Sequence, residues 1–245
     1  MRTIEKTEFN GLKPVSCNYT EAVGCILKAL DDSRKKVFIH LNFYNYYILK
    51  KKARLTDIII ENTLPFIEGI GMKAVACLKG WGVLDDVNGT DLFPILLDKL
   101  IHKKYSVFLL GATDDVIKEA AYRIRKKYHY LDICGFHNGY FAIDDEQEII
   151  GTINKSGARL LLLGMGMEKE AAFLNRNYSM LDTKVIWAVG GLFDFISGRL
   201  PRAPLFLRKI RLEWLFRMIM EPGKKAGRLF IFFFWFLFSF NFKKR

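Results

Sequence analysis

The sequence predicts an α/β fold in which a Rossmann-like, mainly parallel sheet is flanked by helices and followed by a basic helical C-terminal appendage. Apolar runs rich in β-branched residues alternate with amphipathic, charged segments along most of the chain. These runs are continuously apolar, as in strands that are covered on both faces. The 245 residues are 51% hydrophobic. This length and composition exclude a disordered chain and a small disulfide-stapled domain.

Five segments have the composition of buried strands: residues 37–42, 105–111, 131–136, 158–164 and 184–191. A further apolar strand precedes Glu68. Residues 114–128 form a helical pattern, with Val116 and Ile117 on the apolar face and Lys118 and Glu119 opposite them. The pattern is that of βα units, which place ligands beyond the carboxyl ends of the strands.

A domain boundary is expected after Gly198, where two prolines in residues 199–204 accompany a shift in charge. We therefore predict an α/β domain over residues 1–198 and an appendage over residues 199–245. Residues 205–221 have the pattern of one amphipathic helix, in which Trp214 and Leu215 are expected to pack on the domain. The apolar run at 229–242 would be about 21 Å long as a helix, short of the roughly 30 Å needed to span a bilayer.

The net charge of +12 is concentrated in the appendage. From residue 199 onward, twelve Lys or Arg residues face only Glu213 and Glu221, whereas the first 198 residues are nearly neutral. Such asymmetry indicates an anionic partner. The hypothesis of a nucleic-acid partner rests on the charge alone. The interleaved Phe, Trp and Leu residues favour an anionic membrane surface, to which the appendage would bind as an interfacial element.

The cysteines predict neither a metal site nor a disulfide framework. Cys17, Cys25, Cys77 and Cys134 lie far apart, without a CxxC pair or a histidine at ligand spacing. The first residues carry charges where a signal peptide needs an apolar core. We expect a cytoplasmic protein with no metal and no cofactor.

Polar groups and glycines follow several predicted strands. Gly111 and Gly164 stand at strand-to-helix junctions that either bind phosphate or only let a helix leave a strand tightly. Glu68 lies in the segment PFIEGIG, after a strand and before two glycines, where it is either a reactive carboxylate or an ordinary helix cap. The segments NGTDL (88–92) and HNGYF (137–141) also combine turn formers with polar side chains.

The order of these pieces resembles the WecG/TagA/CpsF glycosyltransferases. Residues 185–222 match the pattern VGxxFDxxxGxxxRAP, then LEWxxR and EP, and the resemblance extends upstream through EGIG, GTDL and HNGYF, over roughly residues 10–228. It implies an inverting transfer of a sugar from a UDP-sugar to a polyprenyl-diphosphate-linked acceptor, without the DxD metal motif. It further implies a protein that works at the inner face of the cell membrane.

This resemblance gives the candidate site residues. Glu68 stands in the place of the family's proposed aspartate base, and His40 is the next candidate, standing before Asn42 where the family has a threonine. The family's PKQE motif is replaced by residues 166–169, GMEK. The candidate substrate-binding residues are Asn42, Gly69, Asp91, Gly111, His137, Tyr140, Gly164, Glu168, Arg202, Arg208, Arg211 and Arg217. The motif changes imply either altered specificity or a non-catalytic nucleotide-sugar or lipid-binding relative, and the chain is a possible homo-oligomer.

Overall fold

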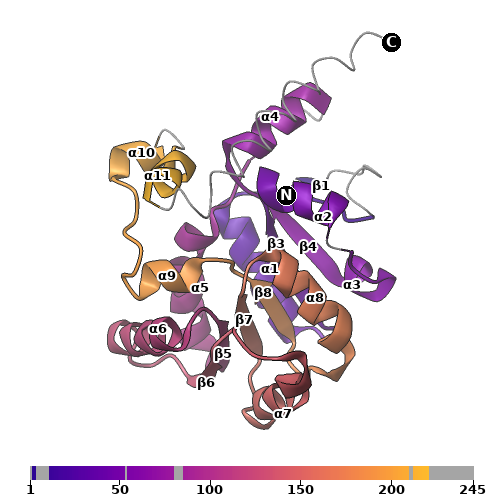
Figure 1. Ribbon diagram of the computed structural model, residues 1–245, viewed down its shortest axis with the longest axis vertical. Coiled ribbons are helices and arrows are strands. Elements are labelled where there is room, and N and C mark those ends of the chain that lie inside the picture. Colours follow the sequence, from indigo (N-terminus) through magenta and orange to yellow (C-terminus); the bar gives the residue numbers. More distant parts are fainter. Residues whose placement is uncertain (1, 4–10, 53, 80–84, 210–211, 221–245) are drawn as a thin grey trace.

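A computed structural model describes residues 2–3, 11–52, 54–79, 85–209 and 212–220. These residues build one eight-stranded sheet in the order β1-β2-β4-β3-β8-β7-β5-β6. Its strands are β1 (Arg2–Thr3), β2 (Val15–Ser16), β3 (Lys36–Leu41), β4 (Thr63–Ile67), β5 (Val107–Gly111), β6 (Ile133–His137), β7 (Leu160–Gly164) and β8 (Val185–Ala188). Neighbouring strands are parallel, except that β1 runs antiparallel to β2 at the edge (Figure 1). The predicted parallel sheet flanked by helices and the predicted strands are therefore confirmed, whereas the basic helical C-terminal appendage stays a prediction.

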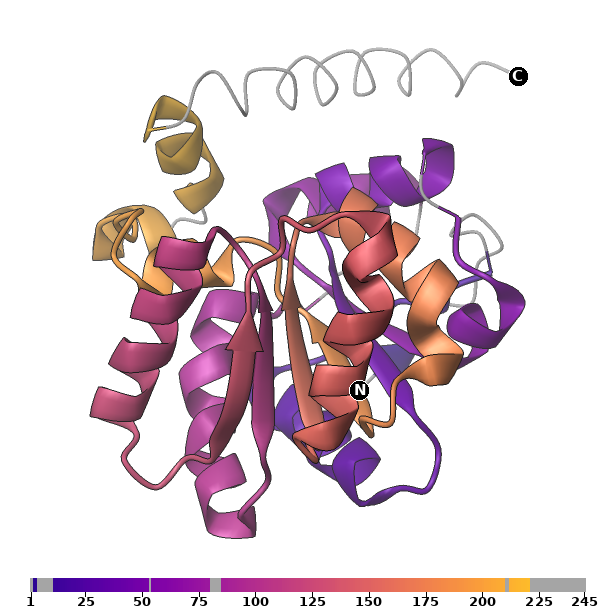
Figure 2. The ribbon, with the colours of Figure 1, turned by 60° about the horizontal axis from the view of Figure 1, so that its bottom comes forward.

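Helices cover both faces of the sheet (Figure 2). One face carries α1 (Tyr19–Asp31), α5 (Gly89–Lys103), α6 (Asp114–Lys127) and α9 (Leu192–Ile196). The other carries α2 (Phe43–Lys51), α3 (Asp57–Asn62), α4 (Gly69–Lys79), α7 (Glu146–Lys155) and α8 (Met167–Asn177). Short 3-10 turns, η2 (Ile143–Asp145) and η3 (Tyr178–Met180), precede α7 and follow α8.

Successive strand residues point into opposite cores. In β3, Val37 and Ile39 belong to the core beneath α2, while Phe38 between them belongs to the core beneath α1 and α5. All three side chains are at most 2% exposed. Burial on both faces explains why the strands read as continuous apolar runs rather than as alternating patterns.

The helix predicted over residues 114–128 is confirmed as α6. Its predicted apolar face is buried, with Val116 and Ile117 against the sheet, and Lys118 and Glu119 are on the solvent side. Lys118 pairs with Asp114 and Arg123 pairs with Glu119 one turn apart on that side. The apolar stripe therefore fixes how α6 faces the sheet, as its period of 3.6 requires.

The prediction of one continuous helix over residues 205–221 is wrong. The structure has two short helices, α10 (Leu205–Lys209) and α11 (Glu213–Met220). The amide of Leu212 bonds to the carbonyl of Leu207 between the two helices, and Glu213, the first residue of α11, forms an ion pair with Arg202. Trp214 is 42% exposed, so the expectation that it packs on the domain is also wrong, while Leu215 is half-buried.

The C-terminal helices lie beyond the edge of the sheet at which the parallel strands end (Figure 2). The chain reaches them from α9 through a segment in which Ala203 is buried. The division into domains at residue 198 stays a prediction. The apolar run at 229–242 lies outside the described residues, and no helix within the described ranges is long and apolar enough to cross a membrane.

Candidate active site

Adjacent strands bring Asn42 and Glu68 together. β3 and β4 pair in parallel with Leu41 opposite Ile67, so the residue after each strand lies at the same edge. The side-chain nitrogen of Asn42 donates to Oε2 of Glu68 over 3.3 Å. The side-chain oxygen of Asn42 caps α2 by accepting from the amide of Asn45 over 2.9 Å. One asparagine therefore starts a helix and orients the candidate base.

The start of α5 supplies the second donor to Glu68. Asn88 caps this helix, and its side-chain oxygen accepts from the amides of Thr90 and Asp91. The amide of Gly89 is thereby left to donate to Oε1 of Glu68 over 3.4 Å. Each oxygen of the half-buried Glu68 carboxylate thus has one donor, from two different elements.

His40 lies in a closed environment beside this carboxylate. Its ring nitrogens are both hydrogen-bonded: Nε2 accepts from the indole of Trp187 over 2.9 Å, and Nδ1 donates to the carbonyl of Val87 over 3.2 Å. Because the indole can only donate, these partners fix the neutral tautomer with its proton on Nδ1. Burial lowers the pKa of His40, against smaller opposing effects of Glu68 and the Val87 carbonyl.

The ring of His40 also sets the position of Gly89. A Cβ on Gly89 would lie 2.8 Å from Nε2 of His40, closer than side-chain atoms pack. Gly89 is therefore needed for its small size, since the helix start must approach the ring for its amide to reach Glu68. His40 contacts the site through this turn.

A buried acid that the sequence did not single out holds the loop after Glu68. Asp86 is 7% exposed, accepts from the amide of Gly69 over 3.3 Å and pairs with Lys73 over 2.8 Å. Gly69 has φ of +80°, a conformation that favours glycine. Asp86 belongs to none of the motifs recognised in the sequence, so no signal in the sequence pointed to it.

Arg202 and Arg208 form ion pairs with acidic side chains of the same protein. Arg202 donates to both carboxylate oxygens of Glu213, over 2.9 and 3.3 Å, and to Asp91 over 2.8 Å. Arg208 lies 3.8 Å from the same Asp91 and donates to the carbonyl of Ala203. Burial lowers the pKa of Arg202, but the bond to Asp91 and the charge of Glu213 outweigh it and raise the pKa overall.

This ion-pair cluster joins segments that the motifs place far apart. Asp91 comes from GTDL, Arg202 from RAP and Glu213 from LEW, so three motif residues meet at the start of α5. Asp91 and Arg202 are therefore brought together, and they lie close to Gly89 and Glu68. Arg211 is outside the described residues, and the side chain of Arg217 on α11 is also not described.

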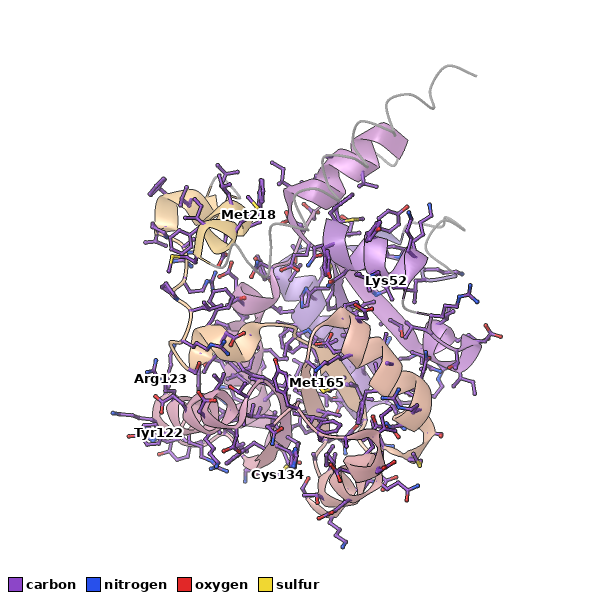
Figure 3. All side chains as sticks on the ribbon, in the orientation of Figure 1. Lys52, Tyr122, Arg123, Cys134, Met165 and Met218 are labelled. Carbon is purple, nitrogen blue, oxygen red and sulfur yellow. The ribbon has the colours of Figure 1, made fainter. Side chains whose placement is uncertain are left out.

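The other candidate residues gather at the ends of β5, β6 and β7. Gly111 and Gly164 lie opposite each other, and a Cβ on Gly111 would overlap the carbonyl of Gly164. Figure 3 labels Met165, next to Gly164, near the middle of the molecule, and Met218 on the C-terminal helix pair. The amide of Ala112 donates to the Gly164 carbonyl over 3.0 Å. Gly111 is thus required by close backbone packing, and Gly164 by the ring of Phe193, which would lie 2.6 Å from a Cβ at that position.

Tyr140, His137 and Glu168 occupy the same edge in different environments. Tyr140 is 68% exposed, and the ammonium of Lys169 lies 4.3 Å from the centre of its ring. His137 is half-buried and bonds through Nδ1 to the carbonyl of Asn138. Glu168 is exposed in the first turn of α8. In the sheet, β8 lies between β3 and β7. The candidate residues therefore form two groups at the carboxyl ends of the strands, one at β3 and β4 and one at β5, β6 and β7.

No group of three or more His, Cys, Asp or Glu side chains stands at metal-binding spacing within the described part of the chain. Cys17, Cys25 and Cys134 are free thiols. The side chain of Cys77 is not described.

Comparison with known proteins identifies a family whose model matches nearly the whole chain, and relatives that match about two thirds of it. The model of the glycosyl transferase WecG/TagA/CpsF family matches residues 8–245. An N-acetylglucosaminyldiphosphoundecaprenol N-acetyl-beta-D-mannosaminyltransferase of Bacillus spizizenii is 32% identical over 157 residues, covering 64% of this chain and 60% of the relative. One of the same name from Bacillus subtilis is 28% identical over 168 residues, covering 69% and 65%. The matched regions thus span less than two thirds of these relatives.

Proposed function

Because the chain belongs to the WecG/TagA/CpsF family, we propose that it is a glycosyltransferase that moves a sugar from a UDP-sugar to a polyprenyl-diphosphate-linked acceptor. The activities named for the two Bacillus relatives make N-acetylmannosamine the first donor sugar to test and N-acetylglucosaminyl-diphosphoundecaprenol the first acceptor. The product would enter a surface polysaccharide or cell-wall polymer.

The observation that carries this proposal is the placement of Glu68. Its carboxylate stands at the carboxyl edge of the sheet, held by Asn42 and the amide of Gly89. We assign it the role of general base. It takes the proton of an acceptor hydroxyl as that oxygen attacks the anomeric carbon, and the bond to the UDP oxygen breaks. Attack from the side opposite to UDP inverts the anomeric centre.

His40 is assigned a positioning role in this proposal. Both of its ring nitrogens are already hydrogen-bonded, and burial lowers its pKa. It keeps the Gly89 turn in place and so acts on Glu68 through that turn.

Stabilisation of the leaving diphosphate is assigned to the start of α4 and to basic side chains nearby. Gly69 has open space beside its Cα, and Lys73 on the same helix is 38% exposed. Cations and N–H groups aimed at developing negative charge lower the barrier to departure of UDP. Each of these cations would first have to leave an acidic partner, Asp86 for Lys73 and Asp91 for Arg202 and Arg208, so their substrate-binding roles stay predictions.

A membrane-surface location supports access to a lipid-linked acceptor. Leu205, Phe206, Trp214 and Ile219 are exposed on α10 and α11, and the exposed fraction is 62% for Phe206 and 69% for Ile219. We propose that this surface, together with the basic residues that the sequence carries in the same C-terminal segment, binds the anionic inner face of the cell membrane from the cytoplasm.

The deciding experiment measures UDP release from UDP-N-acetylmannosamine with a short-chain acceptor of the named type. UDP release that requires acceptor supports the transferase. Binding of the UDP-sugar without turnover would instead identify a non-catalytic nucleotide-sugar-binding relative. A panel of other UDP-sugars in the same assay separates altered donor specificity from lost catalysis.

Metal independence is tested in the same assay. We expect a chelator to leave the rate nearly unchanged, because no DxD motif is present in the sequence. Loss of the rate on chelation, with recovery on addition of magnesium or manganese, would contradict this part of the proposal.

A further inference from the structure

The indole of Trp187 is a buried polar group beside the candidate site. Trp187 lies in β8, and its exposed fraction is 0%. Phe38 in β3 is opposite Trp187 in the parallel register, and His40 lies two residues further along β3. Because side chains alternate along a strand, Phe38 and His40 share one face of the sheet. The indole reaches the ring of His40 there, and its Nε1 donates to Nε2 over 2.9 Å.

This hydrogen bond takes up the one acceptor atom of the neutral histidine ring. A neutral imidazole has one N–H donor and one bare nitrogen that accepts. Nδ1 of His40 lies 3.2 Å from the carbonyl oxygen of Val87, which can only accept, so the N–H is at Nδ1. Nε2 is then the bare nitrogen, and the indole of Trp187 donates to its lone pair. A proton can add to Nε2 only if the bond to Trp187 breaks.

The charged groups near the ring would attract a proton to it. At the carboxyl edge, the charged side chains of the surrounding elements are all acidic: Glu68 after β4, Asp86 before Val87, and Asp91 in the first turn of α5. β8 carries no charged side chain, and α2 carries its charges in its last turn, at Lys50 and Lys51. Other interactions must therefore keep His40 neutral.

Two interactions oppose the acidic surroundings. Burial lowers the pKa of His40, and the charge of Glu68 and the carbonyl of Val87 act against it. The hydrogen bond from Trp187 acts in the same direction as burial, because it stabilises the neutral ring. Loss of this bond should therefore raise the proton affinity of His40.

An uncharged ring in a fixed place matters for the carboxylate of Glu68. Nδ1 of His40 holds the carbonyl of Val87, whose own amide donates to the carbonyl of Ile67 over 2.9 Å. Two residues later, the amide of Gly89 donates to Oε1 of Glu68. A positive charge on the ring would lower the proton affinity of Glu68, as a nearby opposite charge does for any carboxylate.

Packing alone does not account for this arrangement. A buried indole N–H needs an acceptor, but a backbone carbonyl would serve as well. The acceptor of Trp187 is instead a titratable ring, whose centre lies 5.8 Å from that of Trp187 and 6.1 Å from that of Phe66. A contact that only filled space would leave Nε2 of His40 free to take a proton.

We propose that Trp187 is a positioning residue, whose indole N–H occupies Nε2 of His40 and thereby keeps the ring uncharged and in contact with the segment from Val87 to Gly89 that holds Glu68. The consequence for catalysis rests on the proposed function, whereas the state of the ring does not. Trp187 acts on the reaction only through His40 and this segment.

The test compares the wild type with Trp187→Phe, which removes the indole N–H but keeps an aromatic ring. Phe173→Leu is the matched control, because Phe173 is 1% exposed and belongs to the core on the other face of the sheet. His40→Asn is a second variant, whose amide can donate to Val87 from the place of Nδ1 but cannot take up a proton. The double variant completes a thermodynamic cycle.

Two measurements between pH 5.5 and 8.5 are needed. The nitrogen-15 chemical shifts of the His40 ring report its tautomer and charge without any substrate. The kcat for acceptor-dependent UDP release reports the effect on the reaction.

We expect the wild-type ring to stay neutral, with its proton on Nδ1, and the proton affinity of His40 to rise at least about tenfold in Trp187→Phe. At pH 6, kcat of Trp187→Phe should be about tenfold below that of the wild type, and the deficit should shrink as the pH rises to 8.5. In the His40→Asn background, the same change should alter kcat by less than about threefold. Phe173→Leu should give the wild-type ring spectrum and pH profile.

Identical ring shifts in the wild type and Trp187→Phe over the whole pH range would overturn the proposal, as would an equal loss of kcat on Trp187→Phe in both backgrounds. If Trp187→Phe does not fold, the wild-type spectrum decides. A proton on Nε2 of His40 contradicts the proposal, and a scalar coupling across the hydrogen bond from Trp187 supports it. If the wild type shows no turnover, the proposed function fails, and the ring spectra still decide whether Trp187 keeps His40 uncharged.

Discussion

At the scale of single residues, the site depends on side chains that perform two tasks at once. The side-chain oxygen of Asn42 caps α2, and its side-chain nitrogen orients Glu68. Removing such a side chain would disturb a helix start and a carboxylate together. The cleaner probe of the chemistry is therefore Glu68 itself.

Glu68→Gln should preserve the fold and donor binding but lower kcat by about two to four orders of magnitude, as expected for loss of a positioned base. Acceptor-dependent UDP release measures the effect, and circular dichroism checks the fold. Glu61→Gln, an exposed change on α3, is the control. A kcat within a few-fold of the wild type would transfer the role of base to another group.

Glu170, a buried carboxylate on α8 that accepts from the amides of Met165 and Gly166, should leave a signature in the pH dependence of stability. Its pKa is near 4.5 when unfolded and about 7 when folded, so between these values the folded state binds the extra proton. The free energy of unfolding should therefore fall as the pH rises from about 4.5 to 7, at up to roughly 1.4 kcal/mol per pH unit. The Glu170 contribution is complete below this window and lost above it.

Denaturant unfolding of the wild type and Glu170→Gln at several pH values measures this contribution. The free energy of unfolding of the wild type minus that of Glu170→Gln should fall as the pH rises across the same window. A difference that stays constant from pH 5 to 8 would mean that Glu170 keeps one charge state throughout.

At the scale of elements, three motif residues form the contact that holds α11 near α5. Arg202 bonds to Asp91 and to Glu213, and its side chain is 25% exposed. Arg199 is a natural control, because its ion pair is with Asp194, five residues earlier in the chain. The two arginines differ in what they join rather than in their chemistry.

Arg202→Gln should lower the free energy of unfolding by about 1–3 kcal/mol, since Glu213 loses its ion pair and Asp91 keeps the longer, 3.8 Å contact with Arg208. Hydrogen exchange should increase in α11 and in the first turn of α5. Arg199→Gln should cause little change in either region. Equal protection of α11 in both variants would show that apolar contacts, not this cluster, hold the helix.

The elements themselves were largely predictable from the sequence, because a strand buried on both faces leaves an unbroken apolar run and α6 leaves a clear apolar stripe. The break between α10 and α11 was not predictable. The amphipathic pattern of residues 205–221 continues through the break, which the structure shows at the non-helical Leu212. Glu68 was found through its motif, whereas Asp86 and Glu170 act through backbone amides and leave no motif.

At the scale of the whole molecule, charge and apolar surface combine on the C-terminal segment. Binding to anionic vesicles should decrease as salt rises from 0.1 to 1 M, because the Debye length falls from about 10 to about 3 Å. Part of the binding should persist through apolar contacts. Co-sedimentation with vesicles that contain an anionic phospholipid measures both parts.

The double change Phe206→Ser with Trp214→Ser should reduce the salt-resistant part. Tyr130→Ser is the control. Tyr130 is 87% exposed, but it precedes β6 and so lies at the amino ends of the strands, away from the carboxyl ends where α10 and α11 lie. A protein that stays in the supernatant at low salt would exclude the membrane surface as a partner and leave the glycosyltransferase proposal standing.

The order of strands has a consequence for the chain as it leaves the ribosome. β8 is the last strand in the described residues, yet it lies in the middle of the sheet, between β3 and β7. Until residue 188 has been synthesised, the strands β2-β4-β3 and β7-β5-β6 remain two separate half-sheets with unpaired backbone at their inner edges. A nascent or truncated chain that stops before β8 therefore has two strand edges with unpaired backbone groups, which can pair with other chains and aggregate. Synthesis of β8 provides the strand that pairs with both.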